Sequence, residues 1–167
     1  MRNERILVVL RHAKATHQLG FPDVDRPLTH RGRSDATAAG RWLLAATLIP
    51  DLVLCSSSVR TRETWQRVGA ELAGPGDPIA VTYDPRLYDA DTRAIFDVVR
   101  EVPDQVGGLL IVGHNPSAHQ LVIDLTGDGR EDFPTSALAV IGLRTPWSEA
   151  VPGDGELTRF WTPRSVG

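Results

Sequence analysis

Short, fully apolar runs alternate along this chain with longer segments of helical period, and this alternation limits the available folds more than any other feature. Residues 6–10, 52–55 and 109–112 are apolar at every position. This pattern is typical of parallel strands that are buried on both faces. Residues 79–82 form a shorter candidate strand, and residues 138–143 and 157–161 predict later strands that include antiparallel or edge pairings.

Apolar side chains between these runs recur at the spacing of an amphipathic helix. Asn115 and Pro116 predict the start of the last such helix, with Asn115 as its N-cap and Pro116 as its first residue. Alternating strands and helices predict an α/β fold, namely a three-layer α/β/α sandwich with a mostly parallel central sheet. The four helical stripes are Ala36, Ala39, Leu43 and Ala46; Trp65, Val68 and Leu72; Ile95, Val98, Val99 and Val102; and Ala118, Leu121, Val122 and Leu125.

Length and composition fit a single domain over residues 1–167, with an apolar fraction of 41% that can form an ordinary core. The net charge of −3 offers no basic excess to displace counterions, so no nucleic-acid partner is expected. No apolar run approaches the roughly 18 residues of a membrane span, so no membrane partner is expected either. The single cysteine, Cys55, excludes an internal disulfide. We therefore expect a cytoplasmic protein, and we expect it to be a monomer.

Charged and imidazole side chains follow the carboxyl ends of three of the predicted strands. Arg11 and His12 follow the first strand, Arg60 follows the second after a run of serines, and His114 follows the third. Ligands of parallel α/β sheets bind beyond the carboxyl ends of the strands. A lone histidine at a strand end is commonly a structural residue, whereas the joint placement of these four predicts a binding or catalytic site.

The two residue types, arginine and histidine, suit a phosphoryl group. Arginine grips phosphate oxygens with a planar fork and keeps its charge at any working pH. A neutral imidazole can attack phosphorus and carry the phosphoryl group covalently. A second, protonated imidazole and the first amides of the helix near Pro116 could donate further hydrogen bonds. A Cys-phosphatase with Cys55 as nucleophile is disfavoured, because the spacing to Arg60 is one residue too short and the thiol ends a buried run.

Several segments, in the right order, resemble motifs of the histidine phosphatase superfamily, which is also called phosphoglycerate-mutase-like. Residues 10–14 resemble its Arg-His signature, and residues 113–116 resemble the segment that holds its second histidine. Residues 26–32 are similar to the loop and helix start after the signature. The second arginine motif is matched by Ser56, Arg60 and Thr64.

Within the superfamily, the chain resembles the SixA-type phosphohistidine phosphatases. The resemblance rests on the short length, on Ala13 in place of the common glycine, on Leu-Tyr-Asp at residues 87–89 and on residues 134–139. It implies that His12 is the nucleophile, that Arg11 and Arg60 bind the phosphoryl oxygens, and that His114 completes the pocket and stabilises the transition state. It implies no metal and no organic cofactor.

Two aspartates are candidates for the general acid. Asp89 lies where a family carboxylate could act, and Asp91 is its neighbour, although Asp91 could simply cap the helix that follows. The residue after His114 is Asn115, so a carboxylate at that position is absent. An imidazole leaves easily once protonated, so a missing strong acid would favour phosphohistidine over alkyl phosphate esters.

The sequence therefore predicts a phosphatase with a covalent phosphohistidine intermediate and a phosphohistidine-bearing protein, such as a phosphorelay domain, as its substrate. Two alternatives remain. One is a small-molecule phosphomonoesterase on the same site, which acts on a small phosphate ester, whereas a phosphoglycerate mutase is disfavoured because the extra segments of such enzymes are absent. The other is a phosphate-binding module without catalysis.

Overall fold

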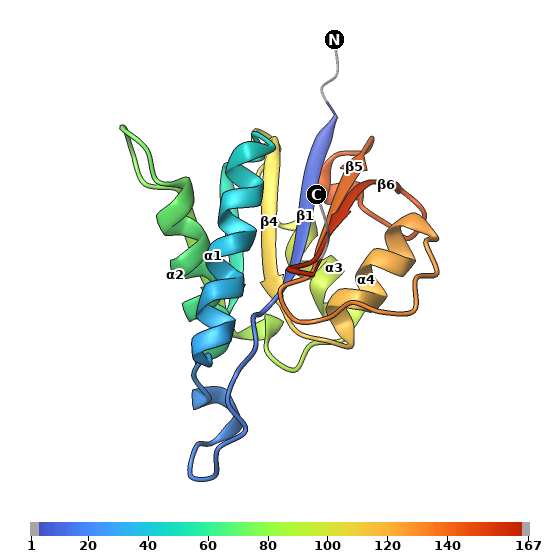
Figure 1. The fold of residues 1–167 in the computed structure, drawn as a ribbon. Helices are drawn as coiled ribbons and strands as arrows, with labels where there is room; N and C mark the ends of the chain where they lie inside the picture. Colours follow the sequence, from blue (N-terminus) through green and yellow to red (C-terminus); the bar gives the residue numbers. More distant parts are fainter. Residues whose placement is uncertain (1–3, 165–167) are drawn as a thin grey trace.

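The computed structural model describes residues 4–164 as a six-stranded sheet with helices on both faces (Figure 1). The strands are β1 (Arg5–Arg11), β2 (Leu52–Ser56), β3 (Ala80–Asp84), β4 (Gly108–Gly113), β5 (Leu138–Leu143) and β6 (Gly155–Trp161). The helices are α1 (His30–Ala45), α2 (Val59–Leu72), α3 (Thr92–Arg100) and α4 (Ser117–Thr126). Short 3-10 turns form η1 (Asp23–Asp25), η2 (Pro85–Leu87) and η3 (Trp147–Glu149).

The strand order in the sheet is β3-β2-β4-β1-β5-β6. β1, β2, β3 and β4 run parallel, β5 runs antiparallel to β1, and β6 pairs antiparallel with β5 at the edge. The expectation of a mostly parallel sheet with late antiparallel and edge strands is confirmed. Because β2, β4 and β1 are neighbours, the residues that follow their carboxyl ends lie together.

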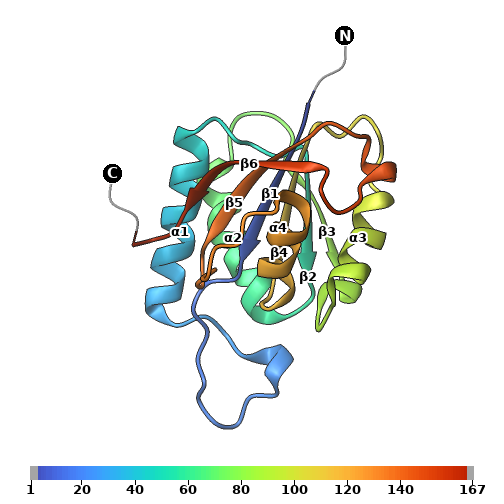
Figure 2. The same ribbon diagram turned by 90° about the vertical axis from the view of Figure 1, so that its right-hand side faces the viewer.

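The molecule has three layers, as the sequence predicts. α1 and α2 cover one face of the sheet, and α3 and α4 cover the other (Figures 1 and 2). β1 contributes to both cores, because successive side chains of a strand point to opposite faces. Leu7 and Val9 pack in one hydrophobic cluster, and Val8 and Leu10 pack in the other. None of the helices described between residues 4 and 164 is long and apolar enough to cross a membrane.

The start of α4 differs from the expectation. α4 begins one residue later than predicted, and Pro116 is its N-cap rather than its first helical residue. Asn115 is not the N-cap; its Oδ1 accepts a hydrogen bond from the amide of His119 at 3.3 Å. The amide of Ala118 donates to the carbonyl of His114 at 2.7 Å. These two amides therefore satisfy local acceptors instead of pointing freely at an anion.

Two further segments differ in detail. The third helical stripe was expected to reach Val102, but α3 ends at Arg100. Pro103 follows Val102 and disfavours helical backbone before it, although Val102 remains buried. The segment between β5 and β6, for which the sequence predicts no helix or strand, contains η3, whose Trp147 is fully buried. The indole of Trp147 donates to the carbonyl of Val106 at 2.7 Å and so fastens this segment.

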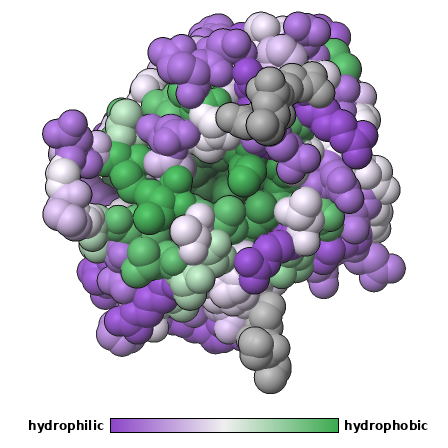
Figure 3. Space-filling model, turned by 90° about the horizontal axis from the view of Figure 1, so that it is seen from above, coloured by the Kyte–Doolittle hydropathy of each residue, from purple (hydrophilic) through white to green (hydrophobic). Residues whose placement is uncertain are grey.

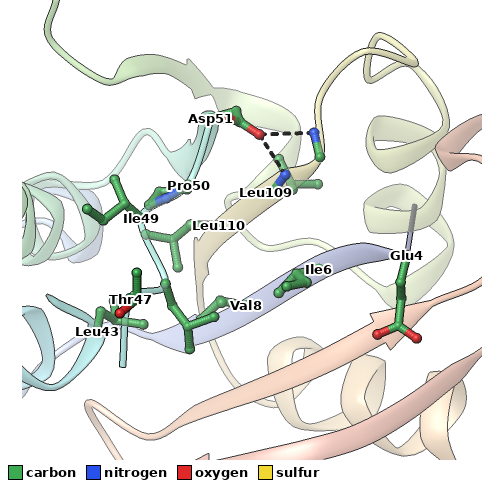
Figure 4. Close-up of a pocket in the computed structure, with 13 residues that line it drawn as sticks. Glu4, Ile6, Val8, Leu43, Thr47, Ile49, Pro50, Asp51, Leu109 and Leu110 are labelled. Carbon is green, nitrogen blue, oxygen red and sulfur yellow. Dashed lines mark hydrogen bonds between the residues drawn. The ribbon is translucent and has the colours of Figure 1, made fainter. Parts of the chain in front are cut away.

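An apolar hollow lies at the end of the sheet where the parallel strands begin (Figure 3). It has a volume of about 250 Å³. Asp51 lies at its rim and accepts hydrogen bonds from the amides of Gly107 and Gly108 at 3.0 and 2.8 Å (Figure 4). The hollow contains none of the residues predicted to bind phosphate; its apolar lining includes Ile6, Val8, Leu43, Ile49, Leu109 and Leu110.

Candidate active site

The four strand-end residues meet at the opposite end of the sheet, as the topology requires. Arg11 ends β1 and His12 follows it, Arg60 lies in the first turn of α2 after β2, and His114 follows β4. All four line one pocket of about 290 Å³. The two imidazole rings are 5.3 Å apart between centroids. The same pocket, called here the phosphoryl pocket, is also lined by Lys14, Ala15, His17, Arg26, Asn115 and Thr135.

The backbone of His12 is fixed on both sides. Its amide donates to the carbonyl of Gly113 at 3.0 Å, and its carbonyl accepts from the amide of Ser136 at 3.1 Å. Ser136 has a left-handed backbone with φ of 63°, which turns its amide toward β1. The amide of Arg11 in turn donates to Ala137 at 3.0 Å. The segment between Phe133 and β5 thus holds the end of β1 in place.

The ring of His12 is held in one tautomer. Its Nδ1 lies 2.7 Å from the carbonyl oxygen of Ala13, and because a carbonyl can only accept, Nδ1 carries the proton. The other nitrogen, Nε2, then holds a lone pair. Burial, with smaller contributions from His114 and the two arginines, lowers the pKa of His12 to about 3. The ring is therefore neutral at physiological pH, as a nucleophile must be.

Thr64 connects this histidine to the second arginine. The amide of Ala13 donates to Thr64 Oγ1 at 2.9 Å, and the same hydroxyl donates to the carbonyl of Arg60 at 2.7 Å. One buried hydroxyl thus bonds both the loop after β1 and the first turn of α2. This link explains physically why a threonine lies four residues after Arg60.

His114 faces the same pocket with a different partner. Its Nε2 lies 2.8 Å from the hydroxyl of Ser56 at the end of β2. Burial, followed by the positive charge of Arg60, lowers the pKa of His114 to about 4. His114 is therefore neutral at pH 7 while no anion is bound. A dianion in the pocket favours its protonated form, because an opposite charge at contact distance stabilises the charged ring.

The two guanidinium groups share the pocket without bonding to each other. Arg11 donates to the carbonyl of Phe133 at 3.2 Å, and burial together with the charge of Arg60 lowers its pKa. The Nε atoms of Arg11 and Arg60 are both buried without a hydrogen-bond partner among the described residues. Two like charges in one pocket repel each other, and a bound oxyanion would offset that repulsion.

Asp23 belongs to the site although the sequence reasoning did not single it out. It lies in η1, and its backbone carbonyl accepts from Arg60 at 2.7 Å. Its carboxylate accepts from Arg60 at 3.1 Å, from Arg26 at 3.1 Å and from the hydroxyl of Tyr88 at 2.5 Å. These hydrogen bonds, that of Tyr88 above all, hold the pKa of Asp23 far below its usual range. The available signal was a carboxylate three residues before Arg26, which is weak in a polar loop.

The two candidate acids, Asp89 and Asp91, have different surroundings. Asp91 accepts a hydrogen bond from the amide of Ala94 at 2.9 Å and is the N-cap of α3, as its alternative interpretation predicts. Asp89 lies instead beside a second, smaller pocket that adjoins the phosphoryl pocket. The structure brings Asp89 to the edge of the site, and its role as general acid stays a prediction.

Cys55 and His119 have structural surroundings. Burial raises the pKa of Cys55 to about 12, so this thiol is no nucleophile. His119 stacks on Phe133 with 6.0 Å between ring centroids and bonds the carbonyl of Arg130 at 2.8 Å. Lys14 lines the phosphoryl pocket. Among residues 4–164, no group of three histidine, cysteine or acidic side chains gathers in a way that could hold a metal ion.

Comparison with known proteins gives a consistent result. Residues 7–97 match the model of the histidine phosphatase superfamily (branch 1). An uncharacterized protein of Mycobacterium tuberculosis is 36% identical over 165 residues, which cover 93% of this chain and all of the relative.

Solved structures extend the similarity to the whole described fold. A chain from Nakamurella multipartitia, assigned as the phosphohistidine phosphatase SixA, superposes with a TM-score of 0.87 and 29% identity over 98% of this chain and 99% of that one. The protein histidine phosphatase SixA in complex with tungstate superposes with a TM-score of 0.80 and 25% identity, over 95% and 97% of the two chains.

Proposed function

Because the chain belongs to the histidine phosphatase superfamily and to its SixA-type branch, we propose that it removes the phosphoryl group from phosphohistidine on a protein, without a metal ion, through a covalent intermediate on His12. The observation that carries this proposal is the free Nε2 of a neutral His12 between two arginines and His114. The SixA structure with tungstate supports it, because tungstate is a tetrahedral oxyanion like phosphate.

The first step transfers the phosphoryl group to the enzyme. Nε2 of His12 attacks phosphorus, the phosphorus–nitrogen bond of the substrate breaks, and its electron pair goes to the departing ring nitrogen. The substrate ring reacts in its protonated form, so it keeps the proton on its other nitrogen and leaves as neutral imidazole. Arg11 and Arg60 neutralise the oxygens during transfer, and His114 adds a donor once it is protonated.

The second step regenerates the enzyme. Water attacks phosphorus, the bond to Nε2 breaks, and the electron pair returns to His12. The protons of water stay with the released phosphate. Nδ1 of His12 keeps its hydrogen bond to Ala13 throughout, so the ring does not change tautomer between the two steps.

The charge of the phosphoryl pocket supports chemistry without a metal. Four cationic side chains line it, and its lining includes no carboxylate. Divalent cations such as Mg²⁺ prefer carboxylate and carbonyl oxygens, so this lining suits an anion and not a hard cation. These cationic residues are Arg11, Lys14, Arg26 and Arg60.

A protein substrate is supported by the loop that contains η1. This loop projects beyond the carboxyl ends of the strands (Figures 1 and 2). It carries Leu19, which is 95% exposed, and Phe21, which is 43% exposed. Exposed apolar side chains beside a catalytic pocket suit contact with a protein surface. We place the reaction in the cytoplasm, where the free Cys55 stays reduced.

The test uses a histidine-phosphorylated protein domain and p-nitrophenyl phosphate as substrates. The wild type should release phosphate from both, and a brief quench should trap acid-labile, alkali-stable phosphate on the enzyme. His12→Ala should abolish both turnover and trapping of phosphate, and its melting temperature should stay close to that of the wild type. Turnover in the His12→Ala protein would overturn the covalent mechanism. Loss of activity with EDTA that added metal restores would overturn metal independence.

A further inference from the structure

Two adjoining pockets of opposite charge meet at Arg60 and His114. The phosphoryl pocket is cationic and contains His12. The second pocket has a volume of about 110 Å³ and does not include His12 in its lining. We call it the acidic pocket; it is lined by Asp23, Tyr88, Asp89, Ala90, Pro116 and Ser117 in addition to Arg60, His114 and Asn115, which both pockets share.

The carboxylate of Asp23 retains capacity for a ligand. Two ionised oxygens can accept about four hydrogen bonds, and the structure gives this group three: from Arg26 to Oδ1, and from Arg60 and Tyr88 to Oδ2. Its side chain is 57% exposed, so an acceptor site on Oδ1 is accessible. The three donors keep the carboxylate of Asp23 ionised. Asp23 can therefore accept a hydrogen bond from a ligand, but it cannot itself donate a proton.

Asp89 contributes a second carboxylate in an unusual backbone conformation. Its φ is 56°, in the left-handed region, which non-glycine residues seldom occupy and which aspartate tolerates better than most. Residues held in such conformations cluster at functional sites. The turn after η2 thus places Asp89 beside the acidic pocket, where Tyr88 packs edge-on against His114 at 5.6 Å between centroids.

We propose that the acidic pocket is the leaving-group subsite for the phosphohistidine ring, with Asp23 and Asp89 binding the ring in its protonated form while the phosphoryl group occupies the phosphoryl pocket. This inference rests on the proposed function. It follows from charge complementarity, because the substrate combines an anionic phosphoryl group with a protonatable ring.

The acidic pocket determines the protonation state in which the substrate ring leaves. A carboxylate that accepts the ring N–H keeps the proton on that nitrogen. The phosphorus–nitrogen bond then breaks toward a ring that leaves as neutral imidazole, rather than as an anion. A phenolate or an alkoxide departs with negative charge, which Asp23 and Asp89 repel. The two carboxylates therefore select phosphorus–nitrogen over phosphorus–oxygen bonds.

The experiment compares kcat/KM for free phosphohistidine and for p-nitrophenyl phosphate in Asp23→Asn, Asp89→Asn and Asp25→Asn. Asparagine keeps the shape at each position, and it also tolerates the left-handed backbone at residue 89. Asp25 is the matched control, because it lies in η1 but lines neither pocket. Competitive inhibition by inorganic phosphate reports whether Arg60 is still in place.

Asp23→Asn should lower kcat/KM for phosphohistidine about tenfold or more, as expected for a lost charge-assisted hydrogen bond, and should raise kcat/KM for p-nitrophenyl phosphate. Asp89→Asn should shift the ratio in the same direction, and Asp25→Asn should not. Unchanged ratios, or equal losses on both substrates, would overturn the subsite. If Asp23→Asn bound phosphohistidine, p-nitrophenyl phosphate and inorganic phosphate all more tightly, Asp23 would only compete with the phosphoryl group for Arg60, and the subsite would be overturned. A wild type inactive on the histidine-phosphorylated protein domain would overturn the proposed function itself, and a wild type active on that domain but not on free phosphohistidine would overturn the subsite.

Discussion

Replacing Arg60 by lysine tests the proposed phosphate site without changing the net charge. In the structure, the two terminal nitrogens of Arg60 reach two different oxygens of Asp23, at 2.7 and 3.1 Å. The same fork can span two oxygens of a phosphoryl group, whereas an ammonium is a single point charge. Loss of one transition-state donor costs about 3–4 kcal/mol, so kcat should fall about 10²- to 10³-fold.

The assay is steady-state hydrolysis of p-nitrophenyl phosphate, with thermal unfolding measured on the same samples. Arg62→Lys is the matched control on the same helix. Arg62 lies 4.1 Å from the ring centre of Tyr83 and donates to the carbonyl of Ser57 at 3.0 Å, outside the phosphoryl pocket. Arg62→Lys should keep most of the activity. An Arg60→Lys enzyme within about threefold of the wild type would refute the bidentate role of Arg60.

Two further predictions concern pH and the projecting loop. In the folded protein the pKa values of His12 and His114 are lowered to about 3 and 4, so both rings stay neutral between pH 7 and pH 5. In the unfolded chain their pKa values are near 6.5, so both rings bind protons in this range. The free energy of unfolding, measured in urea, should therefore fall by about 2 kcal/mol per histidine between pH 7 and pH 5. In the His12→Asn/His114→Asn double variant it should depend less on pH, and an equal pH dependence in the two proteins would contradict both pKa shifts. Leu19→Ser should reduce kcat/KM for a histidine-phosphorylated protein more than for p-nitrophenyl phosphate, and equal effects on the two would argue against contact between Leu19 and the protein substrate.

The sequence predicts the layers and the central four residues because both depend on local pattern. Strands buried on two faces must be apolar throughout, and the parallel order brings Arg11, His12, Arg60 and His114 to one edge whatever the loops do. Strand bounds differ by only a residue or two from the apolar runs. Asp91 as a helix cap was predictable for the same reason, since a cap depends on its immediate neighbours.

The rest of the site depends on contacts between distant segments. Asp23 meets Tyr88 across a sequence separation of 65 residues, and Ser56 meets His114 across 58. No periodicity or spacing rule connects such pairs, because their meeting depends on how the loops fold over the strand ends. Asn115 was predicted to cap α4, but its side-chain amide donates instead to the carbonyl of Phe133 at 2.8 Å, 18 residues further along the chain.

The double anchoring of His12 has a consequence for how the protein loses activity. Its amide and carbonyl bond to chain segments that flank β1 on both sides, so His12, the proposed nucleophile, moves only if the centre of the sheet opens. Amide hydrogen exchange at His12 should therefore require global unfolding, whereas the exposed η1 loop can open locally at much lower free energy. Mild denaturant would then displace Asp23 and Leu19 first and leave His12, the proposed nucleophile, in place. Such a protein would retain chemistry after its selectivity is lost.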